Sequence, residues 1–69
     1  MTSEHVTIKI EHLPEGVFLA TSKEIPGLTV ECETREEILA TAPEIAVELL
    51  EIEAGHPLAK RPRFTFSFI

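Results

Sequence analysis

One helical segment, residues 34–55, constrains the fold of this chain more than any other feature. Thr34 followed by Glu37 is a capping-box pattern, and Gly55 followed by Pro57 is typical of a helix end. Apolar residues between these ends recur with a helical period. They are Ile38, Ala42, Ile45, Leu49 and Ile52, with Leu39, Ala46 and Leu50 beside them. Because no other segment has this period, the helix must lie on a surface that strands provide.

Pro43 lies inside this helical pattern. A proline there removes one backbone hydrogen bond and clashes with the carbonyl of Leu39, at a cost of roughly 3 kcal/mol. The apolar spacing nevertheless keeps its phase from Ile38 to Ile52. We therefore expect one kinked helix, and two short helices that break near Ala42 remain the alternative.

Four flanking segments have the apolar patterns of strands. They are residues 6–11, 17–22, 28–33 and 63–69. The second segment is apolar on both faces, so its second face needs a cover other than the single helix. A Pro-Gly pair at residues 26–27, which suits the central positions of a type II turn, separates the second segment from the third.

The last strand segment carries three of the four phenylalanines of the chain. Phe64, Phe66 and Phe68 recur at period two, so they share one face of a strand. We expect this face to pack against the helix and to anchor the core. The last strand follows a helix, so it can pair in parallel with an earlier strand through a right-handed crossover.

The length of 69 residues predicts one domain, residues 1–69. Such a domain buries only about 60% of its unfolded surface, so homo-oligomerisation is an expected source of further burial. Cys32 is the only cysteine, which suits a reducing compartment. The first five residues lack the features of a signal peptide. We expect a cytoplasmic protein that does not associate with a membrane.

The charge of the chain is unevenly distributed. All twelve acidic residues are glutamates, the formal net charge is −6, and three of the six basic residues lie within residues 60–63. The rest of the chain would repel nucleic acid and steer a basic partner, although a solvated surface explains the same charges. The candidates for an acidic partner surface are Glu11, Glu31 and Glu33, at outward strand positions.

Metal, thiol and nuclease chemistry have weak support in the sequence. The three histidines, His5, His12 and His56, have no recognised ligand spacing. Cys32 shares the inward parity of its strand and is interpreted as a small buried hydrophobe. Metal-dependent nucleases of sheet type rely on aspartate, which this chain lacks, so a nuclease relic using Glu31 is the least favoured alternative. We expect no enzymatic activity, no cofactor and no metal site.

The apolar second strand also predicts self-association. One helix covers one face of the sheet, so Val17 or Leu19 would need a second subunit as a cover. Ile69 adds an apolar group at the end of the last strand, and Arg63 lies at the rim. We expect a homodimer or a dimer of dimers, formed through the outer face of the sheet or through a sheet edge.

Two groups of motifs follow each other along the chain. Residues 25–28 (Ile-Pro-Gly-Leu) precede a strand, and residues 34–38 (Thr-Arg-Glu-Glu-Ile) begin the helix. This order resembles the HicB-like antitoxin family, with Ile38 where an alanine is usual. Residues 43–45 (Pro-Glu-Ile) and 48–51 (Glu-Leu-Leu-Glu) resemble a short, uncharacterised HicB-like subgroup. The resemblance covers about residues 5–55.

The resemblance implies an α+β fold, a β-β-β-α-β two-layer sandwich like a partial ribonuclease H fold without its catalytic acids. Its sheet would have the order 3-2-1-4, with the last strand parallel to the first and one kinked helix on one face. It also implies a function, because HicB-like proteins neutralise HicA-like toxins, which are small basic proteins that cleave messenger RNA.

These observations together lead us to expect a HicB-like antitoxin or regulatory module that binds and neutralises a small basic RNA-targeting toxin. Fuller HicB proteins carry a C-terminal DNA-binding module, and this sequence ends at Ile69 directly after its last strand. We therefore expect no direct DNA binding. An orphan homo-oligomeric domain with another role is the main alternative.

Overall fold

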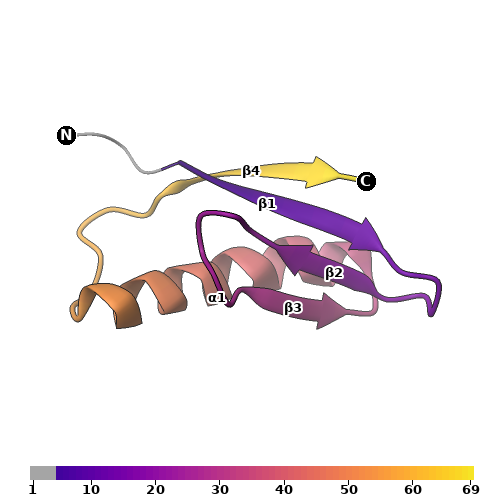
Figure 1. Ribbon diagram of the computed structural model, residues 1–69, viewed down its shortest axis with the longest axis horizontal. Helices are drawn as coiled ribbons and strands as arrows, with labels where there is room; N and C mark the ends of the chain where they lie inside the picture. Colours follow the sequence, from indigo (N-terminus) through magenta and orange to yellow (C-terminus); the bar gives the residue numbers. More distant parts are fainter. Residues whose placement is uncertain (1–4) are drawn as a thin grey trace.

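Four strands and one helix lie in two layers (Figure 1). The computed structural model describes residues 5–69. The elements in chain order are β1 (His5–His12), β2 (Phe18–Thr21), β3 (Thr29–Cys32), α1 (Arg35–Ala54) and β4 (Arg63–Phe68). The first three strands form an antiparallel meander, and β4 lies parallel to β1, so the sheet order is β3-β2-β1-β4. The α+β fold and the order 3-2-1-4 are confirmed.

α1 begins and ends as the sequence predicts. The hydroxyl of Thr34 accepts a hydrogen bond from the N–H of Glu37 at 3.1 Å. Gly55 has a left-handed φ of 81° and donates its N–H to the carbonyl oxygen of Glu51. Pro43 lies inside α1 without ending it, which confirms one helix rather than two. The lost hydrogen bond is offset by the buried face of α1, which consists of Ile38, Ala42 and Ala46.

The turn before β3 is of type II, as expected. The N–H of Leu28 donates to the carbonyl oxygen of Ile25 at 3.1 Å, and Gly27 between them has a φ of 92°. Ile25 and Leu28 are both buried. The turn therefore contributes two aliphatic side chains to the core as well as reversing the chain.

The core is aliphatic and lies between α1 and the inner face of the sheet. β1 supplies Val6, Ile8 and Ile10, which are all fully buried. The other residues of this core are Ala20, Ile25, Leu28, Val30, Ile38, Ala42 and Ala46. Ala20 shows that α1 covers the even-numbered face of β2, which the sequence pattern left open. Cys32 is half-buried and packs against this core, as expected of a small hydrophobe.

The phenylalanines of β4 share the inner face of the sheet but are only partly buried. The parallel register places Phe64, Phe66 and Phe68 beside the buried residues of β1. Phe64 and Phe66 are half-buried, and Phe68 is 46% exposed. α1 lies over β2 and β3, whereas β4 is the edge strand on the far side of β1. Phe64 and Phe66 pack against the aliphatic core, but none of the three rings is fully buried, so this strand contributes less to the core than expected.

The carboxylate of Glu24 links β1 to the segment that follows β2. An Oε1 atom of Glu24 accepts a hydrogen bond from the backbone N–H of Thr7 at 3.3 Å and another from the hydroxyl of Ser22 at 3.0 Å. The hydrogen bond from Ser22, followed by the backbone donors of Glu24 and Thr7, lowers the pKa of the Glu24 carboxyl.

We predict that Glu24→Gln lowers the free energy of unfolding at neutral pH and that this difference disappears in acid. Because the folded-state pKa is lowered, the stabilisation is fully present above the ordinary value of 4.5 and is lost as the pH falls through the folded-state pKa. Urea denaturation of both proteins, from about pH 7 down to about pH 3, measures the difference. A difference that stayed constant over this range would contradict the assignment.

Candidate partner-binding surface

The outer face of the sheet, opposite α1, brings four candidate residues into one row. The strand register pairs Glu11 with Leu19, and Leu19 with Glu31. On the other side of β1, the N–H of Ile69 donates to the carbonyl oxygen of Ile10 at 3.0 Å and continues the parallel register of β4. Ile69 therefore lies beside Glu11, and the row runs across all four strands.

A second row lies at the turn between β1 and β2. The N–H of Leu13 donates to the carbonyl oxygen of Val17 at 2.8 Å, so these residues continue the antiparallel ladder. Because side chains alternate along a strand, Val17 shares the face of Leu19, and Glu33 shares the face of Glu31. Leu13, Val17 and Leu19 are half-buried, whereas the glutamates are exposed. We define the acidic–apolar patch as Leu13, Val17 and Leu19 with Glu11, Glu31 and Glu33.

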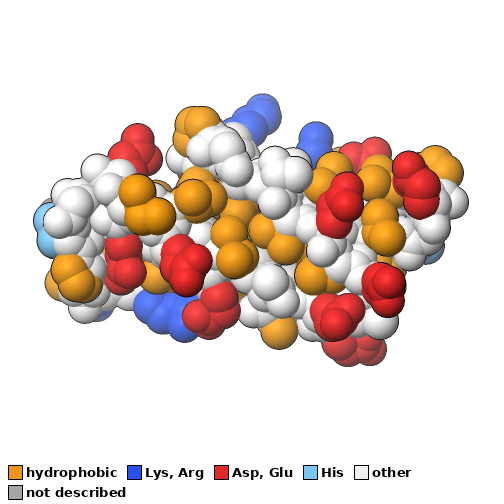
Figure 2. Space-filling model, turned by 90° about the horizontal axis from the view of Figure 1, so that it is seen from below, with side chains coloured by type: hydrophobic (Ala, Val, Ile, Leu, Met, Phe, Trp, Pro, Cys, Tyr) orange, Lys and Arg blue, Asp and Glu red, His pale blue; other side chains and the backbone are white. Residues whose placement is uncertain are grey.

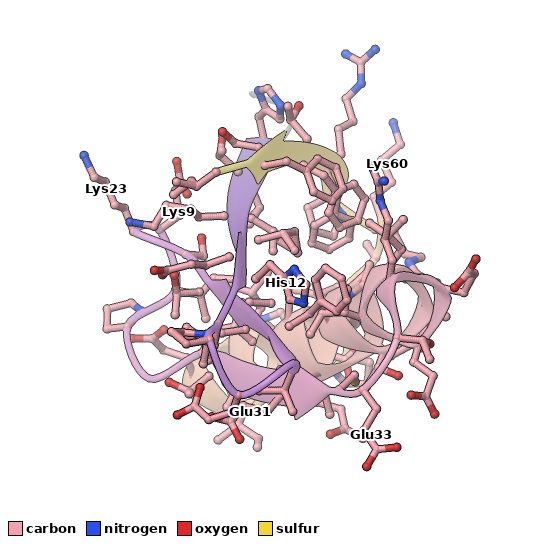
Figure 3. The ribbon with its side chains drawn as sticks, turned by 90° about the vertical axis from the view of Figure 1, so that its right-hand side faces the viewer. Lys9, His12, Lys23, Glu31, Glu33 and Lys60 are labelled. Carbon is pink, nitrogen blue, oxygen red and sulfur yellow. The ribbon has the colours of Figure 1, made fainter. Side chains whose placement is uncertain are left out.

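Basic side chains occupy another part of the outer face. Lys9 and Lys23 point to one side of the molecule, away from the helix, and Glu31 and Glu33 lie along its lower side (Figure 3). The two lysines line a hollow of about 430 Å³ together with Glu24 and with hydroxyl side chains that include Thr7. The lysines of the outer face therefore lie apart from Glu31 and Glu33, in a region where Glu24 is the acidic residue.

Arg63 does not join the acidic–apolar patch. It stands opposite His5 at the start of β4, whereas Ile69 follows the end of the same strand. Ile69 lies six positions after Arg63 in extended chain, which corresponds to roughly 20 Å. The four residues predicted to form one interface therefore divide into three near the patch and one at the opposite end of β4.

The histidines considered for metal binding lie in three separate places. His5 contacts the hydroxyl of Thr65 on the outer face, and His56 lies in the loop after α1. His12 is on the inner face, where its ring stacks on Phe18 with centroids 4.4 Å apart. Within residues 5–69, no three His, Cys, Asp or Glu side chains are grouped so that they could hold a metal ion.

Sequence reasoning missed a contact at the open end of the sandwich. The guanidinium of Arg35 lies 4.4 Å from the ring centroid of Phe68, which links the first turn of α1 to the edge strand. The sequence contains one hint of this contact. A basic residue in the first turn of a helix interacts unfavourably with the helix dipole, so Arg35 needs a favourable contact elsewhere. Arg35 therefore compensates in part for the missing cover over β4.

The fold defines the class of protein as a small α+β domain with a mixed four-stranded sheet and one helix. In the part of the chain that the structure describes, no helix combines the length and the hydropathy needed to cross a membrane. A family described as a domain of unknown function (DUF1902) matches residues 5–68. Because this match covers nearly the whole chain, the protein belongs to that family. No curated protein and no solved structure matches the chain.

Proposed function

We propose that this protein is a HicB-like antitoxin or regulatory module that binds and neutralises a small basic toxin acting on RNA. The match to the DUF1902 family over residues 5–68 supports the proposal together with residues 25–28 and 34–38, which resemble the motifs of HicB-like proteins. The observation that carries it is the acidic–apolar patch, where the fold places glutamates around half-buried aliphatic side chains.

The composition of the patch suits a basic protein partner. Binding energy at protein interfaces comes mainly from a small desolvated centre, which Leu19 and its neighbours Leu13 and Val17 can supply. The surrounding carboxylates steer a positively charged partner and set its orientation. Glutamates also lie among apolar side chains on the face of the molecule seen from below (Figure 2).

Binding at this patch accounts for neutralisation in physical terms. A protein that cleaves RNA must present lysine and arginine side chains to the phosphates of its substrate. The carboxylates of Glu11, Glu31 and Glu33 are complementary to the same cations. A toxin held on the patch would therefore have its RNA-binding groups covered, and inhibition would need no contact with its catalytic residues. The proposal places both proteins in the cytoplasm, where messenger RNA is translated.

We predict that Glu31→Lys weakens binding of the toxin at least tenfold. The substitution puts a cation in the row beside Leu19, where it repels a basic partner. The probe is the small basic protein recovered with the wild-type chain by affinity purification, and its RNA cleavage is measured against added wild type or variant. Glu53→Lys makes the same change of charge at an exposed position of α1, and it should inhibit cleavage as the wild type does.

Two results would count against this function. Equal inhibition by Glu31→Lys and Glu53→Lys would show that the acidic–apolar patch does not carry the binding. Magnesium-dependent RNA cleavage by the chain alone, lost in Glu31→Gln, would instead support the nuclease alternative.

A further inference from the structure

The outer edge of β4 is open. β4 pairs with β1 on one side, and no strand within residues 5–69 pairs with its other side. Figure 1 shows β4 running along the border of the molecule, with its free side turned away from the other strands. An edge of six residues offers unpaired backbone groups to any strand that can approach it.

The register shows which backbone groups face this edge. Because Ile69 donates its N–H to the carbonyl oxygen of Ile10, Ile69 and every second residue before it in β4 turn their backbone groups to β1. The N–H and C=O groups of Phe64, Phe66 and Phe68 therefore point to the open edge. These three residues offer the donors and acceptors for a further strand.

The side chains at this edge are also apolar and incompletely covered. Phe64 and Phe66 are half-buried, Phe68 is 46% exposed and Ile69 is 71% exposed. Open edges in soluble proteins are usually protected by charges, prolines or bulges. No charged residue and no proline follows Arg63 in this strand. The edge therefore combines free backbone groups with an apolar surface.

We propose that β4 pairs antiparallel with β4 of a second copy of this chain, with Phe66 on the twofold axis. Directly opposed residues in an antiparallel pair share a face, and the residues that point their backbone groups outward must oppose each other. With Phe66 opposite the partner's Phe66, Phe64 lies opposite the partner's Phe68. All seven residues 63–69 are then paired, and six phenylalanines form one layer beneath a continuous eight-stranded sheet.

Charge complementarity supports this register. On the outer face, Arg63 lies opposite the partner's Ile69, which stands beside the partner's Glu11. The basic end of one row, His5 and Arg63, therefore continues into the acidic end of the partner's row. The twofold axis repeats this contact on the other side. The two ends of β4 that lie far apart in one chain are thus neighbours in the dimer.

The area available is consistent with a stable dimer. A fully buried phenylalanine removes on the order of 150–250 Å² from water. Phe64, Phe66 and Phe68 of two chains can contribute the part of this that is still exposed in each chain. Two Ile69 side chains and two strand backbones add to this area, and a specific interface is expected to bury roughly 1,000 Å² or more in total. The second copy also covers the aromatic side chains that α1 leaves open.

Light scattering on the wild type and two variants tests the pairing. At tens of micromolar we expect twice the chain mass of 7.7 kDa for the wild type. Phe68→Lys puts a charge opposite the partner's Phe64 and should give the monomer mass. Ile52→Lys is the matched control, because Ile52 is 75% exposed on α1, and it should keep the dimer mass. A wild-type mass of 7.7 kDa, or equal masses for the two variants, would overturn the proposal.

Cysteine cross-linking tests the register. In a Cys32→Ser background, Phe66→Cys should form an intermolecular disulfide under mild oxidation, because an opposed hydrogen-bonded pair has a Cα separation of about 5.5 Å and disulfides span roughly 4.4–6.8 Å. Thr65→Cys and Ser67→Cys lie off the axis and should form little. A disulfide at residue 65 or 67 alone would overturn this register, and a dimer without any cross-link would overturn pairing through β4. Circular dichroism verifies that each variant is folded.

Discussion

Replacing Ile8 by alanine is expected to cost about 2–5 kcal/mol in the free energy of unfolding. Ile8 is fully buried at the middle of β1, with β2 on one side and β4 on the other. A domain of 69 residues has a total stability of roughly 3–10 kcal/mol, so this single change removes much of it or all of it. The cost combines the lost burial of apolar surface with the cavity that the smaller side chain leaves.

Urea denaturation followed by circular dichroism measures this cost, at one fixed protein concentration because dimerisation adds to apparent stability. Ile52→Ala is the control, since Ile52 is 75% exposed and should change stability by no more than about 0.5 kcal/mol. Phe66→Ala should cost less than Ile8→Ala in the monomer, because the ring of Phe66 is only half-buried. If Phe66→Ala cost more at low concentration, the aliphatic core would not be the main source of stability.

Replacing Pro43 by alanine is expected to stabilise the protein by about 1–2 kcal/mol. Pro43 lies inside α1, where it has no N–H to donate. A proline ring in a helix interior also crowds the carbonyl four residues earlier, which here belongs to Leu39. A proline in a helix interior is about 3 kcal/mol less favourable than alanine. Part of the gain is lost, because alanine gives the unfolded chain more conformational freedom and the half-buried ring of Pro43 loses some contacts.

The same substitution outside the helix provides the control for this effect. Pro57 is exposed in the loop after α1, so Pro57→Ala should leave stability unchanged or lower it slightly. Thermal and urea denaturation of the two variants separate the helix effect from the general effect of losing a proline. A stability for Pro43→Ala below that of the wild type would show that the ring is needed for packing between α1 and the sheet.

Local features of the fold are predictable from this sequence because they depend on neighbouring residues. The cap at Thr34, the left-handed Gly55 and the turn at residues 25–28 each involve a hydrogen bond across four or five residues. The alternation of β1 and β4 follows from the period of a strand. The order of elements, together with the family resemblance, was sufficient to predict the sheet order 3-2-1-4.

The candidate surface was only partly predictable. The outward parity of Glu11, Leu19 and Glu31 follows from the sequence, but their alignment in one row depends on the registers between three strands. Spacing along the chain does not determine these registers. The distance between Arg63 and Ile69 does follow from the sequence, because they lie at opposite ends of one predicted strand.

Only the tertiary structure shows how far α1 covers β4. The sequence determined that Phe64, Phe66 and Phe68 share one face of a strand, because that depends on strand parity alone. Whether the helix reaches them depends on its position across the sheet, and α1 lies over β2 and β3. One helix is narrower than four strands about 4.8 Å apart, so an edge of the sheet is left uncovered. That edge carries Phe64, Phe66 and Phe68. Their partial exposure results from the position of the helix on the sheet, which the strand pattern does not reveal.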